Sequence, residues 1–84
     1  MDLTRITQIA WARLLPNEQV PQHRHPDMDE CFFFTKGSGE IIVDEVKYEL
    51  AEGVFLIIPA GGSHSLYCTG ETLEFFYFGL QVYG

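Results

Sequence analysis

Basic side chains are scarce in this 84-residue chain, which carries five Lys and Arg against twelve Asp and Glu and has a formal net charge of −7. The five basic residues are scattered singly, so no basic stripe is available to follow a phosphate backbone. We therefore expect neither nucleic acid nor an anionic membrane as a partner. The acidic excess is explained well enough as the charge that keeps a small apolar domain soluble.

Long apolar runs are also missing. The longest stretches, at residues 32–34 and 54–59, have the length of strands and fall short of the roughly 20 residues that a membrane helix needs. The first residues show no basic segment followed by an apolar one, so no signal peptide is expected. Two cysteines, Cys31 and Cys68, do not make a disulfide framework. These absences together predict a cytoplasmic protein with free thiols.

Turn-forming residues, by contrast, are frequent, and Gly, Pro, Asn and Asp divide the chain into short strand-like segments. The strands expected between these turn-forming residues cover residues 11–15, 20–25, 30–35, 40–43, 46–50, 54–58, 64–68 and 73–83. No segment keeps an apolar stripe at helical spacing for more than about two turns. The pattern predicts one all-β domain over residues 1–84, with 1–10 as an N-terminal arm and 11–84 as a small sandwich or barrel.

The three histidines of the chain are placed where a metal site would need them. His23 and His25 are two residues apart on an expected strand and so project from the same face. Glu30 returns at the start of the next strand, and His64 follows the 59–63 turn. Three nitrogens and one oxygen suit one divalent transition metal (Fe, Mn, Co, Ni, Cu or Zn) better than Ca or Mg. A His-x-His pair alone is more often a structural or surface feature than a ligand pair.

The spacing around these histidines resembles the two sequence motifs of the cupin superfamily. The first motif is written G-x5-H-x-H-x3-4-E-x6-G and the second G-x5-P-x-G-x2-H-x3-N. The positions that agree are His23, His25, Glu30, Gly37, Gly53, Pro59, Gly61 and His64. The resemblance covers the chain from about Trp11 onward, and it implies a small jelly-roll barrel that binds a metal through His23, His25, Glu30 and His64.

The chain departs from these motifs at three positions. Asn17 stands in place of the first glycine, and because Asn tolerates the left-handed backbone conformation we expect the turn to survive. Val54 stands where many relatives carry Asp, and Cys68 replaces the final Asn. By strand alternation Cys68 shares a face with His64, so its thiol either touches the metal or substrate or, as we favour, is a small buried apolar group. Cys31 should face away from the site.

Alternation along the strands also predicts which side chains line a substrate pocket. The residues assigned to it are Phe32, Phe34, Tyr48, Leu66 and Cys68. In the C-terminal run, Phe75 and Tyr77 oppose Phe76 and Phe78, and alternation alone does not say which pair is inside. Aromatic residues on both faces predict that one set is covered, either by a second copy of the chain or by residues 1–10. We expect a homodimer.

The function implied by the resemblance is that of a small metalloenzyme of the dioxygenase, isomerase or decarboxylase type, acting on a small organic molecule that chelates the metal. Groups able to transfer protons are few, namely Tyr48, Tyr67, Tyr77 and Glu30, and the sequence assigns no catalytic residue. The alternative is a non-catalytic protein that binds a small molecule through its metal.

Overall fold

The computed structural model describes the backbone of residues 3–83 and the side chains of residues 9–81. Strands dominate it, and the described residues contain no helix. The strands are β1 (Leu3–Leu14), β2 (Gln19–His23), β3 (Asp29–Val43), β4 (Val46–Ala51), β5 (Phe55–Ile58) and β6 (His64–Tyr83). Within the described range there is accordingly no helix long and apolar enough to cross a bilayer. The all-β prediction is confirmed.

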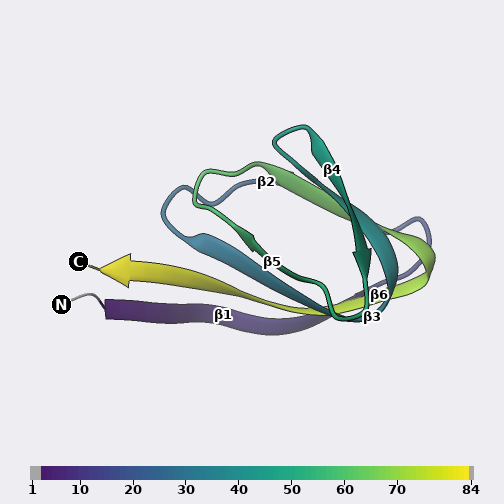
Figure 1. Ribbon diagram of the computed structural model, residues 1–84, viewed down its shortest axis with the longest axis horizontal. Helices are drawn as coiled ribbons and strands as arrows, with labels where there is room; N and C mark the ends of the chain where they lie inside the picture. The colour runs from purple at the N-terminus through teal and green to yellow at the C-terminus, as the bar shows by residue number, and fades with distance from the viewer. Residues whose placement is uncertain (1–2, 84) are drawn as a thin grey trace.

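The six strands form one antiparallel sheet that folds over into two layers, and β3 and β6 run through both layers (Figure 1). The first part of β3 and the last part of β6 pair with β5 and β1, in the order β1-β6-β3-β5. The remaining parts of β3 and β6 pair with β4 and β2, in the order β2-β6-β3-β4. The result is a small β-barrel whose two long strands belong to both walls.

Two predicted turns are wrong, because each lies inside a continuous strand. Residues 36–39 belong to β3 and residues 69–71 belong to β6. The glycine-rich stretches bend the strands without ending them, since β3 and β6 remain paired on both sides of register shifts at Phe34/Lys36 and Gly37/Gly39. The first strand also begins at Leu3, well before the expected Trp11, and pairs with β6 as far as Tyr83.

Positive φ angles occur at several turns and at the bend inside β3 that contains Gly37, and the left-handed conformation expected at Asn17 is among them. Gly37 and Gly53 both have a φ of 89°, which an L side chain rarely adopts, and Asn17 has a φ of 72°. Asp44 and Glu45 have φ values of 46° and 72° and form the two-residue turn between β3 and β4. Positive φ at both positions is the mark of a type I′ hairpin, which matches the twist of the strands it joins.

The core lies between the two layers and is made of apolar side chains from both. Its buried members are Phe32, Phe34, Ile41, Leu50, Ile58, Leu66, Cys68, Leu73 and Phe75. Among the aromatic residues that alternation left open, Phe75 is inside with an exposed fraction of 2%, whereas Phe76 is 45% exposed. Tyr77 packs against the core from the same side as Phe75. The inward pair is therefore Phe75 and Tyr77.

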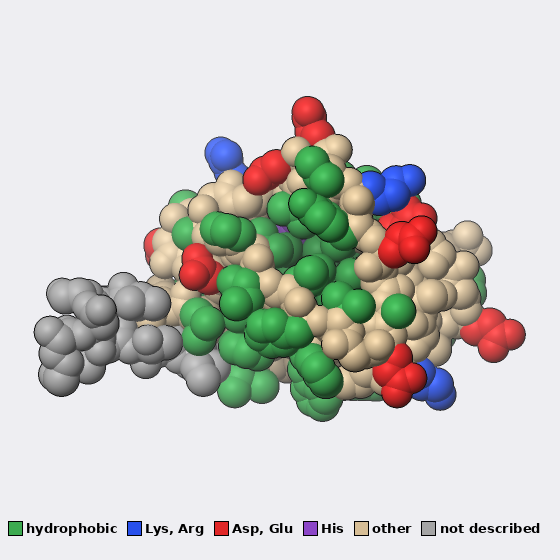
Figure 2. Space-filling model, in the orientation of Figure 1, with side chains coloured by type: hydrophobic (Ala, Val, Ile, Leu, Met, Phe, Trp, Pro, Cys, Tyr) green, Lys and Arg blue, Asp and Glu red, His purple; other side chains and the backbone are tan. Residues whose placement is uncertain are grey.

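The outer side of the β1-β6-β3-β5 layer carries a row of aromatic side chains. Trp11 pairs with Phe76, Phe76 pairs with Phe33, and Phe33 pairs with Phe55, so that the row crosses all four strands. We call these four residues the outer aromatic row. Each is 42–51% exposed, and Ile57 beside them is 54% exposed. Apolar side chains gather along the side of the molecule where β1, β5 and β6 run (Figure 2).

Candidate metal centre

Four polar side chains from separate parts of the chain meet at the end of the core. The Nε2 atoms of His23, His25 and His64 lie 3.6, 3.3 and 3.0 Å from one oxygen of Glu30, Oε2. The rings of His23 and His64 have centroids 4.2 Å apart. The structure thus brings together all four residues that the sequence singled out. Among the described residues, His23, Glu30 and His64 offer ligand atoms that all lie within 4.8 Å of one another, a group that could hold a metal ion.

Strand pairing and local backbone contacts aim the imidazoles at this point. His23 in β2 pairs directly with His64 in β6, which places their rings side by side. His23 Nδ1 lies 2.9 Å from the Pro21 carbonyl oxygen and His64 Nδ1 lies 3.2 Å from the Gly62 carbonyl oxygen. An Nδ1–H that donates to a carbonyl leaves the Nε2 lone pair free to bind a metal. Both rings therefore present Nε2 to Glu30.

Two buried atoms of the site have no hydrogen-bond partner. Glu30 Oε2 and His64 Nε2 lie 3.0 Å apart, but their orientation makes no hydrogen bond between them. Unpaired polar atoms are costly inside a protein and need an explanation. Donors about 2.0–2.2 Å from a shared ion lie roughly 3.0–3.6 Å apart when their bonds meet at about 90–115°. The spacings around Glu30 Oε2 match this range, so the residues fit a metal ion.

The electrostatics of the site favour a charged pair when no metal is bound. Burial by itself raises the pKa of Glu30, but the nearby imidazoles, His64 above all, outweigh it, so the pKa lies below its ordinary value of 4.5. Burial alone lowers the pKa of His64, but Glu30 and the Gly62 carbonyl outweigh this, so the pKa lies above its ordinary value of 6.5. Each shift stabilises the ionised form of its group.

These two shifts predict a pH optimum for the stability of the metal-free protein. The contribution of Glu30 is present above its unfolded pKa of 4.5 and is lost as the pH falls through the lower folded value. The contribution of His64 is present below its unfolded pKa of 6.5 and is lost as the pH rises through the higher folded value. The urea concentration at the midpoint of unfolding, measured in EDTA, should therefore be highest between pH 4.5 and pH 6.5.

Metal should remove the alkaline decline, because metal binding requires neutral imidazoles and strengthens as the pH rises. The same urea titrations with saturating Zn(II) test this, and Glu30→Gln serves as the control that should flatten the metal-free profile. Metal-free stability that rises steadily above neutral pH would contradict the prediction.

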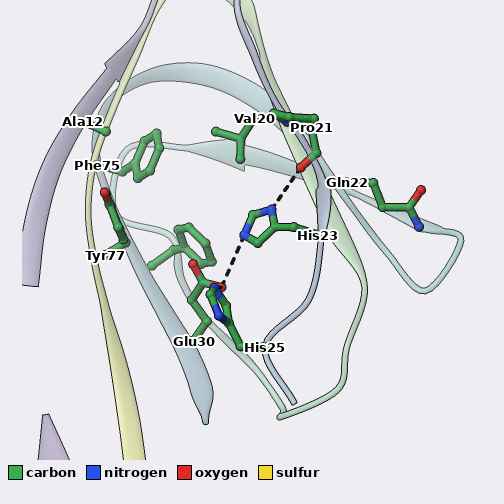
Figure 3. A pocket seen from close by; sticks show the side chains of 10 residues that line it. Ala12, Val20, Pro21, Gln22, His23, His25, Glu30, Phe75 and Tyr77 are labelled. Atoms are coloured by element: carbon green, nitrogen blue, oxygen red, sulfur yellow. Dashed lines mark hydrogen bonds and ion pairs between the residues drawn. The ribbon is translucent and has the colours of Figure 1, made fainter. Parts of the chain in front are cut away.

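A cavity of about 430 Å³ opens beside His23, His25 and Glu30. Its lining residues are Ala12, Val20, Pro21, Gln22, His23, His25, Glu30, Phe32, Phe75 and Tyr77. Figure 3 shows His23 and Glu30 pointing toward each other, with Phe75 and Tyr77 on the facing wall. The wall opposite the metal donors is therefore aromatic, with the Tyr77 hydroxyl as its polar group.

The five residues predicted to line a substrate pocket lie in three different places in the structure. Phe32 lines the cavity beside Glu30. Phe34 and Leu66 are wholly buried in the core behind it. Cys68 is also a core residue, and its thiol donates to the Gly70 carbonyl 3.3 Å away. Tyr48 is 49% exposed on β4 and borders a different hollow, so its assignment to this cavity is wrong.

Of the three tyrosines considered for proton transfer, Tyr77 is the one that lines the cavity. The Tyr67 hydroxyl instead donates to Glu40, which also forms an ion pair of 3.3 Å with Lys47. Strand alternation could not place Tyr77, because it does not tell which side of β6 faces inward. The cavity residues from β1 and β2, Ala12 and Val20, were missed because their placement depends on register shifts in β1–β6 and β2–β6.

Fold and site together define a β-barrel protein with a cluster of His and Glu able to hold one metal ion. The model of the Cupin_2 family, described as the cupin domain, matches residues 10–79. The chain therefore belongs to the cupin family, which confirms the resemblance seen in its motifs.

Two curated proteins from bacteria are similar to the chain. Protein SchB of Streptomyces halstedii is 34% identical over 56 residues, which are 67% of this chain and 41% of SchB. The dimethylsulfoniopropionate lyase DddW of Ruegeria pomeroyi is 36% identical over 62 residues, which are 74% of this chain and 40% of DddW. The matched segment thus spans about two fifths of each relative.

Solved structures show the same fold. A predicted oxalate decarboxylase from Thermotoga maritima superposes with a TM-score of 0.83 at 26% identity, covering 87% of this chain and 64% of that one. A conserved protein of unknown function from Streptococcus pyogenes gives a TM-score of 0.81 at 26% identity and covers 96% of this chain and 75% of its own.

Proposed function

We propose that this protein is a small metalloenzyme that binds one divalent transition metal and acts on a compact organic molecule chelating that metal through oxygen. The observation that carries the proposal is the convergence of three imidazole nitrogens within 3.6 Å of one Glu30 oxygen, beside an open cavity. His23, His25, Glu30 and His64 are the proposed ligands. The donor set suits Fe, Mn, Co, Ni, Cu or Zn.

His25 is the ligand with the weakest structural support. Its Nε2 lies 3.3 Å from Glu30 Oε2, yet His25 is not in the group of donors that all lie within 4.8 Å of one another, which consists of His23, Glu30 and His64. The side chains of His25 and His23 are each 34% exposed, whereas that of His64 is 1% exposed. We include His25 because its nitrogen faces the same carboxylate oxygen as the other two imidazoles.

The cavity wall supports a small and partly apolar substrate. Phe32, Phe75 and Tyr77 form an aromatic group with ring centroids 5.9–6.3 Å apart, and Phe75 and Tyr77 lie across the cavity from the metal donors (Figure 3). A bound metal would supply Lewis-acid chemistry to a substrate oxygen. The aromatic side chains would exclude water and hold the apolar part of the substrate, while the Tyr77 hydroxyl would donate or accept a proton.

The reaction class is proposed at the level of dioxygenase, isomerase or decarboxylase chemistry. One relative, DddW, is a lyase, which supports bond-breaking chemistry in proteins of this kind. The fold itself hosts several reactions and does not choose among them. The predicted cytoplasmic location, where both thiols would stay reduced, is part of the same proposal.

A non-catalytic binding protein is the second candidate. It is favoured because the cavity has few groups that could transfer a proton. Among its described lining residues, Tyr77 is the one titratable group apart from the proposed metal ligands. Such a protein would hold a metal-chelated metabolite without transforming it.

Metal analysis and turnover assays distinguish these candidates. The protein, purified without a histidine tag, is expected to contain close to one metal ion per chain. Metal-free protein reloaded with Fe, Mn, Co, Ni, Cu or Zn is then assayed with small diols, thiols, diketones and carboxylic acids, by oxygen uptake and by product analysis. Turnover with one metal supports the enzyme, binding without turnover supports the binder, and absence of metal binding refutes both.

We also propose that the protein forms a homodimer through the outer aromatic row. The row and its exposed neighbours Ile9 and Ile57 offer on the order of 500 Å² of apolar area per copy, if about half of each side chain is open. A stable interface buries about 800 Å² per partner, so this face supplies most of what is needed. A second copy presents the same uncharged row, whereas the rest of the chain is acidic.

Charge placed in this row should separate the subunits. The double variant Trp11→Glu, Phe76→Glu is expected to sediment as a monomer at concentrations where the wild-type protein has twice the chain mass. Tyr48→Glu is the matched control, since Tyr48 is 49% exposed on β4 in the other layer. A monomeric wild-type protein, or a double variant that remains dimeric, would exclude this interface.

A further inference from the structure

The turn at residues 59–63, just before His64, contacts every other part of the chain that carries a proposed ligand. It is closed by a hydrogen bond of 2.9 Å from the Gly62 amide to the Pro59 carbonyl. Its outward contacts involve three backbone amides, one hydroxyl and one backbone carbonyl. We call residues 59–63 the ligand-positioning turn.

Two amides of this turn reach the segment that bears His25 and Glu30. The Gly61 amide donates to the His25 carbonyl at 2.7 Å. The Ala60 amide donates at 2.9 Å to a carboxylate oxygen of Asp29, the residue directly before Glu30. The turn therefore holds His25 through the His25 carbonyl, and it holds Glu30 through the adjacent Asp29.

A side-chain contact ties the turn to β2. Gln22, directly before His23, donates from Nε2 to the Ser63 hydroxyl at 2.6 Å. The β2–β6 register shifts between Val20 and His23, and Pro21 has no amide hydrogen for the ladder. Figure 3 shows the Gln22 side chain turned away from the cavity. Its contact with Ser63 thus takes the place of a missing backbone link beside His23.

The turn is itself braced from behind. The Asp44 amide donates to the Ser63 carbonyl at 2.9 Å, and the Ser63 amide donates to the Asp44 carboxylate at 3.0 Å. A Cβ added to Gly62 would come within 2.8 Å of the Ile58 side chain, so the turn also packs closely against the end of β5. It is therefore a fixed reference for the groups bonded to it.

Strand pairing alone does not fix these four groups relative to one another. Among the described pairings β2 pairs with β6, and no ladder joins it to β3, which bears Glu30. We propose that the ligand-positioning turn sets the spacing of the proposed ligands before metal binds, with Gln22, Asp29 and Ser63 as positioning residues. The inference rests on the proposed metal site and concerns residues that do not bind the metal themselves.

The test measures Co(II) affinity by chelator competition, together with the visible spectrum of the bound Co(II). Gln22→Ala, Asp29→Ala and Ser63→Ala are each expected to weaken binding about 10-fold and to change the spectrum, because loss of contacts outside the ligand set loosens the segments that carry the ligands. Asp29→Asn and Ser63→Thr keep the hydrogen-bonding oxygen and should retain wild-type affinity. Ser65 lies in β6, two residues after Ser63, and Ser65→Ala is the matched control that should bind Co(II) as the wild-type protein does.

Nitrogen–proton NMR spectra of the histidine rings in the metal-free protein give a second readout. At a pH high enough for both rings to be neutral, the wild-type protein should show His23 and His64 with the proton on Nδ1, and the alanine variants should show mixed tautomers. Alanine variants that match Ser65→Ala in affinity, Co(II) spectrum and ring spectra overturn the inference. If the wild-type protein binds no metal, the proposed function fails, and the ring spectra alone then decide whether the turn positions the histidines.

Discussion

Replacing His64 with glutamine is expected to weaken the binding of Zn(II) or Co(II) by at least about 100-fold, since even changes outside the ligand set cost about 10–100-fold. His64 is 1% exposed and its Nε2 lies 3.0 Å from Glu30 Oε2, the shortest of the three imidazole distances. Glutamine fills similar space but does not place a nitrogen lone pair at that point. Isothermal titration and metal content after dialysis measure the effect.

Cys68→Ala is the matched control for His64→Gln. Cys68 lies on the same strand and is buried in the core, and its thiol donates to the Gly70 carbonyl. The control should therefore bind metal as the wild-type protein does. Equal affinity in His64→Gln would refute the proposed ligand set, and loss of affinity in Cys68→Ala would make the thiol part of the site.

Replacing Gly37 with alanine is expected to lower the free energy of unfolding by about 3–5 kcal/mol. An added Cβ would come within 1.9 Å of the Thr72 carbonyl oxygen, and the φ of 89° is itself unfavourable for alanine. The clash is with backbone in β6, so relief requires the two long strands to separate. Since small domains have about 5–15 kcal/mol in all, the variant should be marginally folded.

Gly53→Ala separates the two causes, because Gly53 has the same φ of 89° but open space where its Cβ would be. This variant should lose only about 1–2 kcal/mol, the usual cost of a left-handed residue. Urea unfolding of both variants gives the comparison. Equal losses at the two positions would show that the close approach of β3 and β6 contributes little.

The sequence predicted the site better than the rest of the molecule, for a physical reason. His23 and His25 were expected on one strand with Glu30 just after the next loop, and the spacing of the second motif locates His64 after a turn. The strand was predicted too long, because β2 ends at His23 and His25 lies in the loop that follows, but all three imidazoles still face Glu30. The cavity wall was predicted less well, because it depends on which residues of distant strands lie opposite each other.

The bends in β3 and β6 show why strand limits were harder to predict. Gly37 and Gly70 lie in stretches that look like turns when each stretch is considered alone. In the structure β6 lies opposite the first bend and β3 opposite the second, and a Cβ at Gly70 would come within 2.5 Å of the Ser38 hydroxyl. The glycines permit close crossing of two paired strands, which no single segment reveals.

The inward and outward faces of the C-terminal strand posed a similar problem. Phe75 and Phe76 are equally apolar, so composition could not separate them. Phe75 is inside because it lies opposite Ala12 and Phe34, whereas Phe76 lies opposite Trp11 and Phe33 on the outer side. Only the pairing of three strands settles the choice.

The pairing of β1 with β6 has a consequence for how the chain folds during synthesis. The first strand finds its bonding partners in the last one, from Leu3 opposite Tyr83 to Leu14 opposite Leu73. While the ribosome is still translating β6, β1 has no native neighbour and its backbone edge and Trp11 are open to other nascent chains. The pairing of β1 with β6 therefore comes late in folding, and contacts between residues so distant along the chain make folding slow.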